Sequence, residues 1–183
     1  VTVEGCLRKG ISEKTASLLF DRMIDFASYA FNKSHATAYA IIAYQTAYLK
    51  YYYPQQYMTA YLNSVIANQV KVRNYIGVAK KMGIPILRPD INECEAMFTQ
   101  NKEGICMGLT SIKNIGNSIK EAIAERQKNG NFKSLEDLTE RVLLGKKELE
   151  SLIKSGSLDC FKHKRSQMLN SLDNIVKHGK RAA

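Results

Sequence analysis

A short polar run, Phe31-Asn32-Lys33-Ser34-His35-Ala36, stands at the head of a long stretch rich in alanine and tyrosine. It places a cation, a hydroxyl and an imidazole at three consecutive positions. The start of a helix leaves backbone N–H groups unpaired and carries the positive end of the helix dipole, so it favours an anion. This run could therefore contact a triphosphate or a phosphodiester. Its spacing alone favours a plainer interpretation, in which Ser34 is a helix N-cap with two solvated neighbours.

A second candidate is the segment Gly108–Arg126, which has the form of a helix-hairpin-helix. A short helix ends in an apolar residue plus glycine, and a second helix begins at once. Gly116 would let the backbone approach a phosphate, and Lys113 and Lys120 would supply positive charge. Such hairpins usually have glycine where this chain has Asn114, but asparagine tolerates the left-handed conformation. The alternative interpretation is a plain helix–helix turn with a capping glycine.

A third candidate is the acidic cluster of Asp90, Glu93 and Glu95. Carboxylates that hold two Mg²⁺ ions are the usual requirement of nucleotidyl transfer. This cluster follows an extended stretch that contains prolines, so we interpret its members as turn and surface residues. We therefore expect neither metal ligands nor catalytic residues in this sequence.

The charge balance indicates a polyanionic partner. The 183 residues carry 27 Lys+Arg against 17 Asp+Glu, a net charge of +10. Such an excess is typical of proteins that bind nucleic acid or an anionic membrane. Residues 101–183 carry 16 basic and 10 acidic side chains, against 11 and 7 in residues 1–100, so the back half is favoured for nucleic-acid contact. The longest apolar run, residues 36–49, is too short and too polar to span a membrane.

The cysteines are consistent with a reducing, cytoplasmic setting. The four cysteines are scattered without CxxC spacing, so neither a disulfide framework nor a zinc knuckle is expected. Residues 1–10 have no apolar core followed by a small-residue cleavage site, and no signal peptide is predicted there.

Hydrophobic periodicity predicts a mainly α fold with a small β connector. Proline at position 54 should end the helix before it, and glycine at position 83 should end another. Prolines at 85 and 89 favour extended backbone, and two short strands follow, joined by a polar turn. Helices are predicted over residues 11–29, 36–52, 56–67, 71–82, 117–127 and 146–155, with others starting near 132 and 163, and strands over 97–99 and 105–107.

Several blocks of this sequence resemble one family. FNKSHATAYAIIAYQTAYLKYYYPQQYMTAYL resembles the fingers segment of the bacterial DNA polymerase III alpha subunit, the C-family replicative polymerase. The upstream VEGCLRKGISEKTASLLFDRMIDFASYAF is similar in pattern. The downstream blocks GIPILRPDINECEAMFT, GLTSIKNIGNSIKEAI, FKSLEDL and KKELESLIKSGSLDCF follow in the same order as in the family.

The resemblance implies roles for particular residues. In this family the fingers cover the nascent base pair and the incoming nucleotide, and the hairpin region holds duplex DNA behind the active site. Tyr44, Tyr48 and Tyr57 are expected to pack in the core. The candidates for the deoxynucleoside triphosphate site are Asn32, Lys33, Ser34, His35 and Tyr39, and those for DNA binding are Lys113, Asn114, Gly116, Asn117 and Lys120.

The resemblance also implies that this is an internal fragment of a larger polymerase. Residues 1–82 would be the C-terminal part of the fingers, 83–160 the β connector with the helix-hairpin-helix module, and 161–183 a basic helical tail. The parent would use Mg²⁺ held by carboxylates in a palm that precedes this segment, and would meet other replicase subunits and a sliding clamp. The alternatives are a stand-alone basic helix-hairpin-helix DNA-binding protein and a scaffold for an acidic protein partner.

Overall fold

The computed structural model describes residues 4–28 and 32–179. Predictions for Tyr29, Phe31 and the basic residues 180 and 181 lie outside the described residues. The chain forms two compact units, Val1–Tyr48 and Leu49–Ala183. The three-part division into fingers segment, connector with hairpin, and tail stays a prediction.

The first unit contains α1 (Glu4–Leu7), α2 (Glu13–Ser28) and most of α3 (Lys33–Tyr52). Ser12 caps α2, because its hydroxyl accepts the N–H of Thr15 at 3.3 Å. Ala16 is buried, whereas Met23 and other apolar side chains of α2 are exposed. This unit therefore has little core of its own among the described residues.

Helix α3 begins three residues before its predicted start and buries none of its described side chains. The expectation that Tyr44 and Tyr48 pack in the core was wrong, since they are 71% and 45% exposed. Apolar side chains are spread around this helix, so it has no single stripe that one neighbouring helix could cover.

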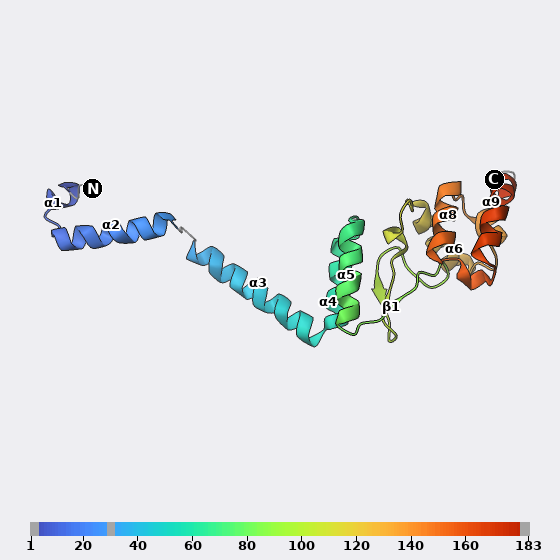
Figure 1. Cartoon of the computed structure of the whole chain (residues 1–183), viewed down its shortest axis with the longest axis horizontal. Helices are drawn as coiled ribbons and strands as arrows, with labels where there is room; N and C mark the ends of the chain where they lie inside the picture. The colour runs from blue at the N-terminus through green and yellow to red at the C-terminus, as the bar shows by residue number, and fades with distance from the viewer. Residues whose placement is uncertain (1–3, 29–31, 180–183) are drawn as a thin grey trace. The chain divides into compact units, whose positions relative to one another are not determined.

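In the second unit, α4 (Pro54–Ser64) and α5 (Gln69–Lys81) form an antiparallel pair (Figure 1). Proline 54 both follows the end of α3 and occupies the first position of α4, where a missing N–H costs nothing. The hydroxyl of Tyr61 donates to that of Tyr75 at 2.9 Å across the pair. As predicted, Tyr57 packs against a core, whose buried members are Met58, Leu62, Val72, Ala79, Ile84, Phe98 and Ile105.

A three-stranded sheet follows the pair, with β1 (Ile86–Leu87), β2 (Thr99–Gln100) and β3 (Ile105–Cys106). The central strand β3 is parallel to β1 and antiparallel to β2. The β2–β3 hairpin was predicted, and the extended stretch before it supplies the third strand. Asn63 of α4 holds the residue that precedes β2. Its side-chain amide donates to the carbonyl of Phe98, and its side-chain oxygen accepts the N–H of Phe98.

The remaining elements are η1 (Leu109–Ser111), α6 (Ser118–Asn129), α7 (Leu135–Arg141), α8 (Lys146–Ser155), η2 (Asp159–Phe161) and α9 (Arg165–Gly179). They surround the larger core, in which Ile119, Leu138, Leu149 and Leu152 have no exposed surface. Helix α9 packs against α7 and α8 through the buried Met168 and Leu172 (Figure 1). The prediction of a mainly α fold with a small β element is confirmed.

Arg126 joins α6 to the loop that contains the acidic cluster. This side chain is 7% exposed, and its guanidinium donates to the carbonyls of Ile91 and Cys94 at 2.7 and 2.9 Å. It also forms an ion pair with Glu95 at 2.8 Å. A buried cation is tolerated here because every contact satisfies one of its donors.

No helix in the described part of the chain is long and apolar enough to cross a membrane.

Candidate nucleic-acid interface

The predicted hairpin consists of the short helix η1, a turn over residues 112–117 and helix α6. Asn114 lies at the turn with φ of 65°, the left-handed conformation that glycine adopts most easily. Its side-chain amide lies 3.4 Å from the hydroxyl of Ser151 on α8. Asparagine therefore does take the conformation expected of a glycine at this position.

The segment that leads into the turn is held by hydrogen bonds to two other parts of the chain and by close packing at Gly108. The hydroxyl of Thr110 donates to the carbonyl of Ala96 at 2.6 Å, and Gln69 of α5 donates to the carbonyl of Ser111 at 2.7 Å. A Cβ at Gly108 would lie 2.5 Å from the carbonyl carbon of Met97, so only glycine fits at this position. The hairpin is thus anchored to α5 and to the segment that precedes β2.

Two donors at the start of α6, one backbone N–H and one hydroxyl, are bound by the same glutamate. The N–H of Gly116 donates to Oε1 of Glu148 at 3.2 Å, and the hydroxyl of Ser118 donates to the same oxygen. Oε2 of Glu148 accepts the N–H of Gly145 at 2.9 Å. A single carboxylate therefore contacts the starts of both α6 and α8.

The Glu148 carboxylate is held in its charged form. Its partial burial raises the pKa, but hydrogen bonds from Ser118, Gly145 and Gly116 outweigh that effect, and its pKa lies below the ordinary value. Glu148 was not among the predicted site residues. The available signal was its position three residues after Gly145, the spacing of a capping box.

The loop before α8 repeats the form of the first hairpin. Leu144 is apolar, Gly145 follows it, and α8 begins at Lys146. The same order, an apolar residue and then glycine, occurs at Ile115 and Gly116. Sequence reasoning identified α8 but did not single out this repeated pair of residue types.

A groove of about 620 Å³ lies between the turn and α8. Lys113 and Asn114 line it from the turn, and the side chains of α8 form the other wall. Glu150 pairs with Lys154, whereas Lys113 and Lys147 form no ion pair with any described residue. The groove is therefore electropositive. Its lining is Ile112, Lys113, Asn114, Lys147, Glu150, Ser151, Lys154 and Ser155.

Two of the five predicted DNA-contact residues, Lys113 and Asn114, thus lie in one groove. Asn117 and Lys120 are exposed beside it at the start of α6, and neither lines the groove. Gly116 is exposed as well, but its N–H is bound to Glu148.

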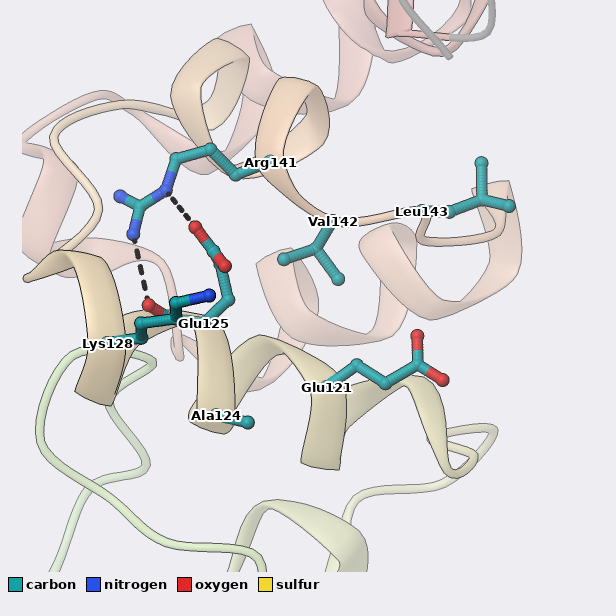
Figure 2. Close-up of a pocket in the computed structure, with 7 residues that line it drawn as sticks. All are labelled: Glu121, Ala124, Glu125, Lys128, Arg141, Val142 and Leu143. Atoms are coloured by element: carbon teal, nitrogen blue, oxygen red, sulfur yellow. Dashed lines mark hydrogen bonds and ion pairs between the residues drawn. The ribbon is translucent and has the colours of Figure 1, made fainter.

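A second hollow, of about 330 Å³, lies between α6 and the end of α7 (Figure 2). Figure 2 shows Arg141 reaching toward Glu125, and the distance between Nε and Oε1 is 3.1 Å. Arg141 also lies 4.5 Å over the ring of Phe132. Because Arg141 is held by these partners and none of the predicted site residues lines this hollow, it is not the candidate site.

The predicted nucleotide-contact residues lie at the exposed start of α3. Asn32 caps this helix, because its Oδ1 accepts the N–H of Ser34 at 2.9 Å. The interpretation of Ser34 as the N-cap was therefore wrong, because Ser34 lies within the helix, which begins at Lys33. The rings of His35 and Tyr39 lie 4.2 Å apart.

The acidic cluster does not suit a metal ion. Asp90 accepts the N–H of Asn92 at 2.7 Å, which is a turn contact, and Glu95 pairs with Arg126. Burial raises the pKa of Cys94 to about 11 and that of Cys160 to about 12, so neither thiol supplies a thiolate near neutral pH. Among the described residues no group of three or more His, Cys, Asp or Glu could hold a metal. Within the described ranges, Asp90 and Glu95 are therefore engaged in turn and ion-pair contacts and not in a metal site.

Comparison with known proteins supports the resemblance. Residues 83–168 match the family model described as a helix-hairpin-helix motif. The chain is 43% identical over 178 residues to the DNA polymerase III subunit alpha of Borreliella burgdorferi, covering 95% of this chain and 16% of that protein. The chain is similar to a segment of this subunit along nearly its whole length.

Relatives from other bacteria agree. Identity is 42% over 179 residues with the same subunit of Thermus aquaticus and 40% over 179 residues with that of Bacillus subtilis. Each match covers 96% of this chain but only 15% and 16% of the relatives' lengths. The resemblance to DNA polymerase III alpha is thus confirmed, for a segment much shorter than those proteins.

Proposed function

We propose that this chain is the part of a replicative DNA polymerase that holds duplex DNA by its phosphates, without reading the base sequence. The observation that carries the proposal is the electropositive groove between the hairpin turn and α8. The helix-hairpin-helix match and the similarity to DNA polymerase III alpha support duplex DNA as the occupant.

The groove suits a phosphate backbone for three reasons. Lys113 and Lys147 have no acidic partner among the described residues, so their charges are available to a ligand. Asn114 and Ser151 add hydrogen-bonding groups to the same lining. Exposed Lys120 and Asn117 extend this surface along α6. Contacts of this kind set the position of a duplex but carry no sequence information.

Binding of labelled duplexes by the 183-residue chain tests the proposal. The logarithm of the association constant should fall linearly with the logarithm of salt concentration, because each phosphate contact releases counterions. Two duplexes of unrelated sequence should bind alike. K113A and K120A should each weaken binding and lower the salt slope by about 0.9, the value for one phosphate contact.

The matched control is K102A, which removes the same charge from the exposed β2–β3 turn. This variant should bind like the unmodified chain. If the chain has no salt-dependent affinity for duplexes, or if all three variants lose the same amount, the groove is not the DNA site.

For the start of α3 we propose a contact with the incoming deoxynucleoside triphosphate. Lys33, Ser34 and His35 are exposed at a helix start, and His35 lies against Tyr39. The side chain of Asn32 is committed to capping, so its contribution would be to hold this start in place. In an intact polymerase, K33A and H35A should impair nucleotide use. Unchanged steady-state kinetics in both variants would leave them as solvated neighbours of the cap.

Nucleotidyl transfer itself is proposed for the longer protein, with Mg²⁺ held outside this segment. Its other partners would be further replicase subunits and a sliding clamp, in the cytoplasm. The 183-residue chain with primer-template, Mg²⁺ and nucleotides should therefore give no extension. Extension by the chain would mean that catalytic carboxylates lie within it. A longer protein that contains this segment should extend a primer. If every such protein fails to do so, the alternative of a stand-alone DNA-binding protein is favoured.

A further inference from the structure

Glu148 connects two loops that are distant in the sequence. Its Oε1 accepts from Gly116 and Ser118 at the start of α6, and its Oε2 accepts from Gly145 at the start of α8. Ser118 and Gly116 are separated from Glu148 by 30 and 32 positions. The contact of Oε1 with α6 is therefore a tertiary contact, whereas the contact of Oε2 with Gly145 is local.

The two loops carry the opposite walls of the electropositive groove. Lys113 lies in the turn that Gly116 ends, and Lys147 lies in the first turn of α8, next to Glu148 in the sequence. Asn114 also donates to Ser151 across these walls, but at 3.4 Å, which is long for a strong hydrogen bond. The carboxylate, with three donors, is the firmer connection.

A carboxylate beside a phosphate site would ordinarily oppose DNA binding by repulsion. Glutamine also serves at the third helical position of a capping box, where Glu148 lies in α8, so local capping does not require the charge. Glu148 differs because its two oxygens satisfy donors from both loops at once. A carboxylate has enough lone pairs for three such donors, whereas an amide has a single oxygen.

We propose that Glu148 is a positioning residue for duplex DNA: it holds the turn 112–117 and the start of α8 in the relative placement at which Lys113 and Lys147 contact the phosphate backbone together. This inference rests on the proposed DNA-binding function. Glu148 itself touches no phosphate.

The comparison of E148A with E148Q tests this role, because both variants remove the same charge. Glutamine keeps one oxygen for Gly116 and Ser118, whereas alanine keeps none. Duplex binding by the 183-residue chain is measured over a range of salt concentrations. E148A should lower the salt slope by about 0.9, the value for one phosphate contact, and weaken binding severalfold. E148Q keeps an oxygen for only one of the two loops, so it should shift the slope in the same direction as E148A but by less.

A charge-neutral variant makes the test independent of electrostatics. S118A removes one donor to Glu148 without changing any charge, and should shift the slope in the same direction as E148A by a smaller amount. Thermal unfolding of each variant shows whether it is folded at the binding temperature. If E148A is unfolded there, the comparison of S118A with the unmodified chain decides.

The outcomes separate the two proposals. If the unmodified chain binds duplexes with the expected salt slope but E148A, E148Q and S118A bind as it does, the positioning role is wrong and the DNA-binding function stands. Tighter binding by both E148A and E148Q would show instead that Glu148 competes with phosphate. Loss of all salt-dependent binding in the unmodified chain would remove both proposals.

Discussion

The starts of α3 and α6 carry the two groups of candidate site residues, and they are built in different ways. The start of α3 is held by Asn32, which lies two residues from the N–H it accepts. The start of α6 is held by Glu148, from 30 and 32 positions away. α3 buries no described side chain, whereas α6 contributes Ile119 to a core of fully buried residues.

This difference concerns how much each site depends on the rest of the molecule. A helix start held by local contacts alone is only as stable as its own helix, and isolated helices are marginal in water. A start tied to a packed core keeps its geometry for as long as the core is folded. We therefore expect the DNA-binding groove to be preformed in this chain. For α3 to be held as firmly, apolar side chains other than those of the described residues would have to pack against it.

The largest expected contrast is in the free energy of unfolding, when one side chain is truncated in each region. L152A should lower the free energy of unfolding by about 2–5 kcal/mol, because it leaves a cavity in the larger core, where Leu152 has no exposed surface. Y44A, in exposed α3, should change it by less than about 0.5 kcal/mol. Denaturant unfolding of both variants measures the contrast. Equal losses would mean that α3 is packed as firmly as α8.

A smaller effect is expected for Arg126, which connects α6 to the loop between β1 and β2. R126A should cost about 1–3 kcal/mol, because the carbonyls of Ile91 and Cys94 lose their donor in a buried setting. The control is R73A, at an exposed position of α5, for which we expect almost no change. The same unfolding measurement compares the two. A loss in R126A no greater than that in R73A would show that water replaces the guanidinium without cost.

The smallest effect is expected for the cap of α3. N32A should destabilise the start of this helix by about 1 kcal/mol, and N32D should not, since aspartate also accepts the N–H of Ser34. Amide hydrogen exchange in the first turn of α3 reports this local change. Protection in α6 and α8 should be unaffected. Faster exchange in α6 as well would show that the two helix starts are coupled.

The elements that depend on local chemistry could be predicted. The bounds of α8, from Lys146 to Ser155, follow from its apolar spacing and the glycine after it. The capping of α2 by Ser12 and the left-handed turn at Asn114 follow from the residue types. Tyr44 and Tyr48 show the limit of such reasoning, because helical spacing indicates an apolar face but not whether anything covers it.

The sequence by itself determined the mainly helical fold, the hairpin turn and the excess of positive charge, because propensity, capping and composition act over a few residues. Only the tertiary structure decided that the N–H of Gly116 is bound to Glu148 and that Lys113 faces Lys147 across a groove. Those contacts join residues more than 30 positions apart. Their geometry depends on how the core places α6 against α8, which no local spacing encodes.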